Sequence, residues 1–215
     1  LDGLQGEALS DAYVSKIRAA ITSFEESGVG FAGMIVCPIF ANEGLPNLPP
    51  NFMQKAVDAV HDAGGLFIAD EVQAGFGRTG KMWGHEVAGI VPDIVTMGKP
   101  MGNGFPLGAL AASAELIQGF RDRVMYFNTF GGNPIAGAVG NAVLDVMERD
   151  HLIDNARTTG AYLRKGLAEL AQRHPMISEI RGHGFWVGIE LVRDQDTKEP
   201  ADTETRDIVN RMKER

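Results

Sequence analysis

The sequence predicts an α/β fold: a mostly parallel sheet flanked by helices, followed by part of a smaller α+β unit. Short apolar segments of strand length alternate with helical segments, as expected of parallel strands that are buried on both faces. From about residue 150 this alternation gives way to a long helical segment and a glycine-interrupted extended stretch. We therefore expect residues 1–149 to be part of a large domain and residues 150–215 to be part of a small C-terminal domain.

The individual elements follow from hydrophobic periodicity and from the glycines and prolines that interrupt it. In the first part we expect helices over residues 11–27 and about 52–63, and strands within "FAGMIVCP" (31–38), "GGLFIADE" (64–71), "PDIVTMGK" (92–99) and "PLGALAAS" (106–113). In the second part we expect a helix through residue 173, extended chain with a turn over 175–192, and a polar helix after it.

Composition excludes several classes of protein. The 215 residues, of which 44% are hydrophobic, suffice for one substantial core, and the formal net charge of −8 argues against a nucleic-acid partner. No signal pattern and no apolar run of about 18 residues is present, so we expect no membrane association. The single Cys37 excludes an intrachain disulfide, and no Cys/His spacing predicts a metal site, so a reducing cytoplasm is expected. The chain lacks an initiator methionine and stops within a predicted helix, so we expect a fragment or a processed chain.

Two chemically active side chains follow two of the predicted strands. Asp70 ends "LFIAD" and Lys99 ends "IVTMGK". If these strands are parallel neighbours, both residues emerge at the carboxyl edge of the sheet, where open α/β sheets bind ligands. The sequence therefore predicts a ligand site at this edge.

Lys99 is followed at once by "PMGNG", in which proline restrains the backbone and glycines permit close approach of another molecule. A desolvated lysine amine can form an imine with a carbonyl compound. The alternatives are an ordinary surface cation and a phosphate-binding loop. The second does not fit, because here the glycines follow the lysine instead of leading to it.

Asp70 and Glu71 have two interpretations. Both carboxylates could cap the segment that follows them. A buried carboxylate otherwise needs a cationic or hydrogen-bonding partner, and a protonated pyridine nitrogen is one. Such a pairing makes a pyridine ring a better acceptor for carbanion electrons.

Three segments resemble the class-III aminotransferases, which are pyridoxal-phosphate enzymes of fold type I. They are "FIADEVQAGFGRTGKMWGHEVAGIVPDIVTMGKPMGNGFPLGA", "YFNTFGGNPIAGAVGNAVLDVME" and "IRGHGFWVGIELV". The likeness covers essentially the whole chain, as the central and later part of a longer family member. "TMGKPMGNG" and "YFNTFGGNP" are most similar to the subgroup of ethanolamine-phosphate phospho-lyases and their aminotransferase-like relatives.

The resemblance implies a role for each of five residues. Lys99 would form the internal aldimine with pyridoxal 5′-phosphate and then carry the proton between the substrate and the cofactor. Asp70 would pair with the pyridinium nitrogen, Gln73 would bond near the phenolic oxygen, and Val72 would pack on the ring. Thr129 is similar to the residue that reaches the cofactor phosphate of the other subunit, which implies a homodimer whose site lies at the interface.

The resemblance also implies the reaction. The expected activity is transfer of an amino group from a primary amine or ω-amino acid to a keto acid, through Lys99 and a cofactor in the large domain. One alternative is elimination of phosphate from a phosphorylated amino alcohol. A third interpretation is an inactive fragment that lacks a complete site, because the family's N-terminal portion is not among these residues.

Overall fold

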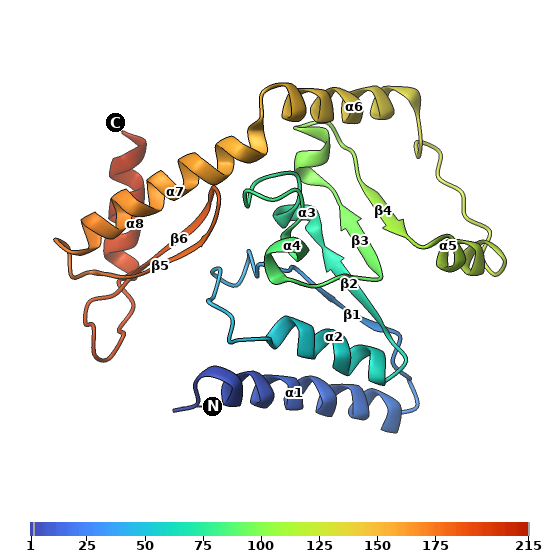
Figure 1. Ribbon diagram of the computed structural model, residues 1–215, viewed down its shortest axis with the longest axis horizontal. Helices are drawn as coiled ribbons and strands as arrows, with labels where there is room; N and C mark the ends of the chain where they lie inside the picture. Colours follow the sequence, from blue (N-terminus) through green and yellow to red (C-terminus); the bar gives the residue numbers. More distant parts are fainter. Residues whose placement is uncertain (2, 215) are drawn as a thin grey trace.

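The computed structural model describes residue 1 and residues 3–214, and its centre is a four-stranded sheet in the order β1-β2-β3-β4 (Figure 1). The strands are β1 (Gly33–Val36), β2 (Leu66–Asp70), β3 (Ile94–Met97) and β4 (Ala109–Ala112). Strands β1, β2 and β3 are parallel, with Val36 opposite Ala69 and Asp70 opposite Thr96. The predicted α/β fold with a mostly parallel sheet is confirmed.

Strand β4 departs from the prediction. The segment 106–113 was expected to be another parallel strand, but β4 pairs antiparallel with β3. The connection between these strands contains only a short 3₁₀ helix, η1 (Lys99–Gly102). A parallel crossover needs a dozen or more residues, usually including a helix, and this connection is too short. The chain therefore reverses direction, and β4 forms a mostly exposed edge of the sheet.

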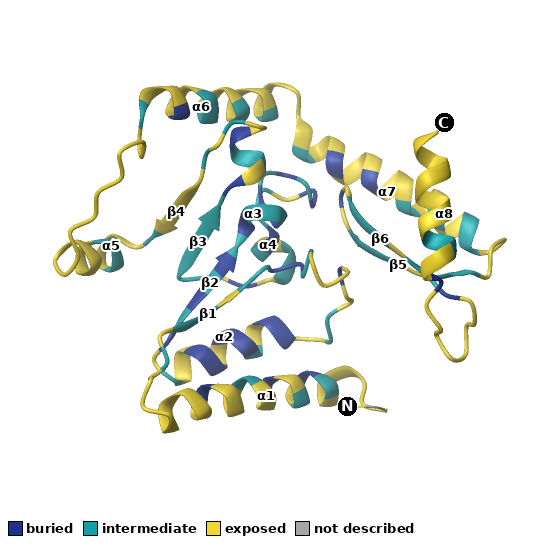
Figure 2. Ribbon diagram, turned by 180° about the vertical axis from the view of Figure 1, so that it is seen from behind, coloured by how far each residue is buried: buried dark blue, intermediate teal, exposed yellow. Residues whose placement is uncertain are grey.

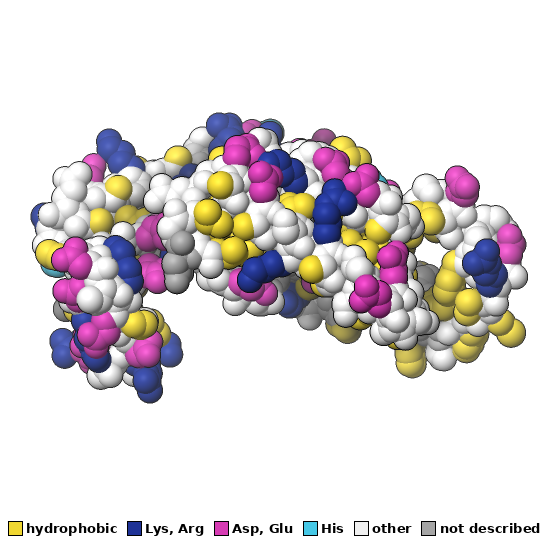
Figure 3. Space-filling view, turned by 90° about the horizontal axis from the view of Figure 1, so that it is seen from below, with side chains coloured by type: hydrophobic (Ala, Val, Ile, Leu, Met, Phe, Trp, Pro, Cys, Tyr) yellow, Lys and Arg dark blue, Asp and Glu magenta, His cyan; other side chains and the backbone are white. Residues whose placement is uncertain are grey.

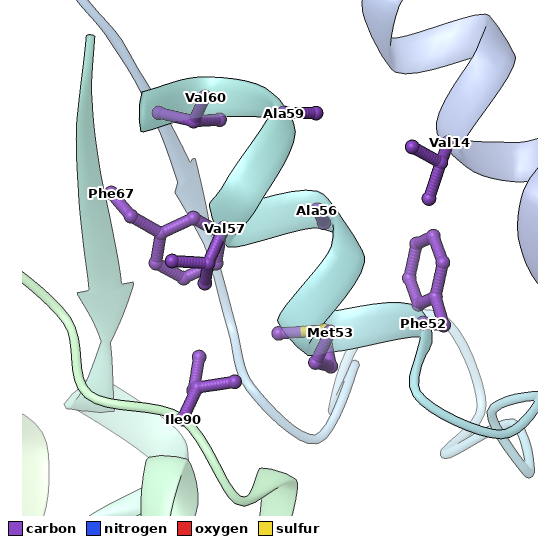
Figure 4. Close-up of a cluster of buried hydrophobic side chains, with 9 residues drawn as sticks. All are labelled: Val14, Phe52, Met53, Ala56, Val57, Ala59, Val60, Phe67 and Ile90. Atoms are coloured by element: carbon purple, nitrogen blue, oxygen red, sulfur yellow. The ribbon is translucent and has the colours of Figure 1, made fainter. Parts of the chain in front are cut away.

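Two helices cover one face of the sheet. Helix α2 (Phe52–Asp62) packs on β2, and α1 (Gly6–Glu26), which begins earlier than the predicted helix at residue 11, packs on α2. Figure 4 shows the core between them, in which side chains of α2 lie between Val14 of α1 and Phe67 of β2. Met53, Ala56, Val57 and Val60 are buried, and their spacing forms the single apolar stripe that an amphipathic helix presents to a core.

The remaining helices of the first part lie around the carboxyl edge of the sheet and beside β4. They are α3 (Glu71–Ala74), α4 (Gly84–Ala88), α5 (Ala114–Arg121) and α6 (Pro134–Arg149). Helix α6 contacts η1, whereas α5 lies at one end of the molecule (Figure 1). Burial is concentrated in α2 and β2, while β4, α5 and the segment after α5 are largely exposed (Figure 2).

The last part of the described chain contains the expected long helix, extended hairpin and polar helix. These are α7 (Leu152–Ala171), the antiparallel strands β5 (Ile177–His183) and β6 (Trp186–Leu191), and α8 (Asp202–Lys213). Helix α6 ends and α7 begins at Asp150 and His151, where His151 has a left-handed backbone with φ of 51°. The division into domains at residues 149 and 150 stays a prediction. Within the described residues, no helix combines the length and the apolar character that a membrane crossing requires.

Candidate active site

The carboxyl edge of the parallel strands brings Asp70 and Lys99 into neighbouring positions. Asp70 is the last residue of β2, and its partner on β3 is Thr96. Lys99 follows Thr96 by three residues, at the start of η1. Cys37 directly follows β1 at the same edge. The three parallel strands therefore deliver a thiol, a carboxylate and an amine to one side of the sheet.

Asp70 is half-buried and forms the N-cap of α3. Its Oδ1 atom accepts a hydrogen bond from the Val72 N–H at 3.0 Å, so the carboxylate satisfies an amide at the start of the short helix. Among the hydrogen bonds of the described residues, none involves Oδ2. One oxygen thus fixes the side chain, and the other remains available to a ligand.

Glu71 is fully buried and has a structural role. It accepts hydrogen bonds from Gly84 N–H at 2.7 Å and His85 N–H at 2.8 Å, which are the first amides of α4. The His85 ring nitrogen Nδ1 lies 2.9 Å from the same carboxylate. The capping interpretation therefore holds for both acidic residues, each with its own helix. Glu71 is fully engaged, whereas Asp70 is not.

Lys99 has a strained backbone and an exposed side chain. Its φ of +37° lies in the left-handed region that lysine rarely adopts, a conformation that costs about 1 kcal/mol or more and is frequent at functional sites. Within the described residues, no hydrogen bond or ion pair engages its Nζ atom. The backbone before it lies against α3, since a β-carbon on Gly98 would be 3.5 Å from Val72 Cγ2. The backbone leading into Lys99 therefore lies beside the Val72 side chain.

Gln73 is held at both its side chain and its main chain. Its Nε2 donates to Asn42 Oδ1 at 2.8 Å, and its carbonyl oxygen accepts the indole N–H of Trp186 at 2.8 Å. Arg78, for which the sequence left structural and functional roles open, lies over the Trp186 ring, with 5.2 Å between its guanidinium carbon and the ring centroid. Sequence reasoning missed Asn42 and Trp186, because contacts across 31 and 113 residues leave no local pattern.

Thr129 is not brought to this edge by its own chain. It is exposed, in the segment that joins α5 to α6 and runs beyond β4 (Figure 1). Asn128 shapes this segment, because its Oδ1 accepts the N–H groups of Phe130 and Gly131. The structure thus brings together Asp70, Val72, Gln73 and Lys99, and leaves Thr129 on the surface.

The comparisons with known proteins agree in their assignment. A family model described as aminotransferase class-III matches residues 5–215. The chain is 49% identical over 183 residues to alanine–glyoxylate aminotransferase 2 homolog 2, mitochondrial, of Arabidopsis thaliana, which covers 85% of the chain and 38% of that protein.

Two solved structures extend the likeness to three dimensions. A phospholyase from Arthrobacter in complex with phosphoethanolamine is 40% identical, with a TM-score of 0.88 over 94% of this chain and 48% of that one. The omega transaminase from Pseudomonas jessenii in complex with PMP is 31% identical, with a TM-score of 0.85 over 93% of this chain and 45% of that one.

The chain spans about two-fifths of the length of the curated relatives it matches and less than half of these solved structures. Class-III aminotransferases use pyridoxal 5′-phosphate as their cofactor. The family model covers nearly all of the sequence, and the strand-end carboxylate and lysine stand where the sequence motifs predicted them. The chain belongs to the class-III aminotransferase family.

Proposed function

We propose that the protein containing this chain is a pyridoxal-phosphate-dependent aminotransferase that moves an amino group from a primary amine or ω-amino acid to a keto acid. The observation that carries the proposal is the placement of Asp70 and Lys99 at the carboxyl ends of adjacent parallel strands. One residue offers a carboxylate oxygen and the other an amine, and neither group is engaged by another side chain of the described chain. Membership of the family supports the same activity.

The side chains at this edge fit the cofactor chemically. Asp70 Oδ2 is an acceptor for a ring N–H, while Oδ1 is fixed by Val72. Gln73 Nε2 has two N–H groups, and Asn42 uses one, which leaves the second for a phenolic oxygen. Val72 offers apolar surface beside the backbone of Gly98, and Lys99 follows directly. Asp70, Val72, Gln73 and Lys99 would therefore hold the ring, and Thr129 would serve the phosphate of a second subunit.

Bound pyridoxal phosphate supplies an aldehyde for amines and a ring that accepts the electrons released when a carbon loses its proton. The Lys99 amine would take that proton from the substrate α-carbon and deliver it to the C4′ carbon of the cofactor. The Asp70 carboxylate would accept a hydrogen bond from the protonated ring nitrogen and so favour the protonated ring. Gln73 would fix the ring orientation through its second side-chain N–H, and Val72 would shield one ring face from water.

Borohydride reduction after incubation with pyridoxal phosphate tests this proposal, because it makes the bond between cofactor and lysine permanent. Peptide mapping of the intact protein should find the label on Lys99 alone. Lys81 and Lys165 are the internal controls, since both are exposed and neither directly follows a strand. Label spread over these lysines, or no label, would favour the interpretation that the site is not assembled.

Phosphate elimination from a phosphorylated amino alcohol is the second candidate. It is favoured by one observation, the 40% identity and TM-score of 0.88 to the phospholyase solved with phosphoethanolamine. The two reactions leave different products. Conversion of the bound cofactor to its pyridoxamine form on adding amine alone supports transfer. Release of one inorganic phosphate per phosphoethanolamine consumed supports elimination.

A homodimer is proposed for the assembled enzyme. The segment around Thr129 exposes several large apolar side chains: Val124, Met125, Tyr126, Phe127 and Phe130. Figure 3 shows apolar side chains gathered at the end of the molecule where α5 and this segment lie. An apolar patch of this kind marks a protein interface, and a second copy would cover it while bringing Thr129 to the partner's site.

We propose the cytoplasm as the compartment of the protein. The single cysteine supports a location that does not require disulfide bonds. Mitochondria are the alternative, because the Arabidopsis relative is named as mitochondrial. Fractionation of cells that express the intact protein at its native level distinguishes the two.

A further inference from the structure

Two distant parts of the chain meet at Gln73. From β6, Trp186 Nε1 donates a hydrogen bond of 2.8 Å to the Gln73 carbonyl oxygen. From the loop after β1, Asn42 Oδ1 accepts one of the side-chain N–H groups at 2.8 Å. The main chain of Gln73 is therefore held by the hairpin β5–β6, and its side chain is held by the loop after β1. Neither contact is supplied by α3 itself.

The hairpin that carries Trp186 packs closely against the loop that follows α3. The Phe185 N–H donates to the Arg78 carbonyl at 2.9 Å, and the Arg78 guanidinium covers the Trp186 ring. Gly184, with φ of +55°, approaches so closely that a β-carbon there would lie 2.4 Å from the Arg78 oxygen. The indole therefore has little freedom to move relative to Gln73.

Helix α3 has little internal support of its own. It is four residues long, and its backbone is closed by the hydrogen bond from Gly75 N–H to the Glu71 carbonyl at 2.9 Å. Asp70 caps it and Gln73 lies near its end, so the bond from Trp186 restrains the end opposite the cap. A shift of the Gln73 carbonyl would turn the whole helix, because a helix of a single turn has no further turns whose backbone hydrogen bonds could hold it in place.

We propose that Trp186 is a positioning residue that acts through Gln73: its indole N–H fixes the orientation of the Gln73 amide toward the cofactor. The inference rests on the proposed function, because it assigns the free N–H of that amide to the phenolic oxygen of pyridoxal phosphate. It makes docking of the β5–β6 hairpin a condition for a correctly ordered cofactor site.

Trp186→Phe in the intact protein is the direct test, because it removes the N–H and retains a ring beneath Arg78. Trp83→Phe is the matched control, since Trp83 is the only other tryptophan and packs on Phe76 and His85. Loss of one hydrogen bond should weaken cofactor binding about fivefold in Trp186→Phe. It should also shift the visible absorption band of the bound cofactor, and the control should change neither.

A double-mutant cycle separates positioning from general loosening. Gln73→Ala removes the amide through which Trp186 is proposed to act. In that background, Trp186→Phe should have a clearly smaller effect on cofactor affinity and on the absorption band than it has in the wild type, because the Gln73 side-chain amide is already lost. Full additivity of the two substitutions would overturn the proposal, as would an unchanged affinity and spectrum in Trp186→Phe alone.

Hydrogen exchange of the cofactor-free protein tests the inference independently of the proposed function. The Val72 amide should exchange about fivefold faster in Trp186→Phe than in Trp83→Phe, because α3 loses its anchor. Equal exchange in both variants would contradict the positioning role. If exchange responds but borohydride labels no Lys99, the proposed cofactor chemistry fails while the role of Trp186 in ordering α3 stands.

Discussion

The two oxygens of Asp70 have different hydrogen-bonding environments. Oδ1 caps α3 by accepting the Val72 N–H, and Oδ2 has no hydrogen bond within the described chain. The adjacent carboxylate of Glu71 is, in contrast, enclosed and bonded to the start of α4. Sequence position alone does not distinguish these neighbours, but their surroundings do.

Asp70→Asn should therefore reduce catalysis without unfolding the protein. Asparagine is as good an N-cap as aspartate, so the Val72 N–H keeps an acceptor. The lost charge no longer favours a protonated ring, and kcat should fall on the order of 10²-fold or more. Steady-state kinetics with an amine and a keto acid measure the effect.

Glu71→Gln is the contrasting variant for this test. An amide has one acceptor oxygen in place of two, so a buried N–H of α4 loses its partner. The free energy of unfolding should fall by about 1–3 kcal/mol as a result. Thermal unfolding measures this loss of stability. An Asp70→Asn enzyme that retains wild-type kcat would contradict the assignment of Asp70.

At the scale of elements, the sequence predicted what depends on local pattern. The stripe of Met53, Ala56, Val57 and Val60 predicted α2, and the apolar run before Asp70 predicted β2. The direction of β4 was missed, because pairing is decided by the length of the connection as well as by hydrophobicity. Trp186 was missed as a partner of Gln73 for a related reason, since its contact depends on tertiary packing.

Glycines of α7 offer a prediction about how the hairpin docks. Gly160 is buried, and a β-carbon on it would lie 2.2 Å from the Gly184 carbonyl oxygen, whereas Gly166 on the same helix has open space. Gly160→Ala should destabilise the protein by about 1–3 kcal/mol through this clash. Gly166→Ala should stabilise it by about 0.5–1 kcal/mol, because alanine favours a helix. Urea unfolding compares the pair, and equal effects would show that the close approach is not required.

Asp93 offers a prediction about pH, because it ties β2 to the loop before β3. Its Oδ2 accepts the Phe67 N–H at 2.7 Å and lies 2.8 Å from His61 Nε2, while its own N–H donates to the Phe67 carbonyl. Burial opposes ionisation, but the bonds from His61 and Phe67 outweigh it and hold the pKa of Asp93 below its usual value. A lowered folded-state pKa stabilises the fold above the unfolded-state pKa near 3.9, and this contribution is lost as pH falls through the folded value.

Asp93→Asn should accordingly lower the free energy of unfolding by about 1 kcal/mol at pH 7. The difference from wild type should shrink as the pH falls below the unfolded-state pKa near 3.9, and should be lost as the pH passes through the lower folded-state pKa of Asp93. Asp58→Asn is the control, since the carboxylate of exposed Asp58 on α2 accepts, among the residues that the structure describes, a hydrogen bond from Gln54 alone. Denaturant unfolding at pH 7 and at low pH gives the comparison, and a constant difference would exclude a contribution from the Asp93 charge.

At the scale of the whole molecule, the candidate residues named by the sequence motifs lie in two separate places. Asp70 and Lys99 share an edge because their strands are parallel neighbours, which a strand-end argument can predict. Thr129 does not join them, and its segment lies exposed beyond β4. Its predicted role depends on a second chain, so no argument confined to one chain can place it.

Phe127→Asp tests this arrangement at the level of assembly. Phe127 is 80% exposed and lies two residues from Thr129, so the charge should leave the isolated subunit intact while making apolar contact with a second copy unfavourable. We expect sedimentation velocity to show a monomer in place of a dimer. Cofactor affinity should fall at least tenfold, a loss of about 1.4 kcal/mol of binding free energy, because Thr129 no longer reaches the cofactor phosphate in the partner subunit. Tyr162→Asp on α7 is the control, because Tyr162 is also 80% exposed, and this variant should remain dimeric. A Phe127→Asp dimer with unchanged affinity would move the interface away from the Thr129 segment and remove the reason for assigning Thr129 to the cofactor.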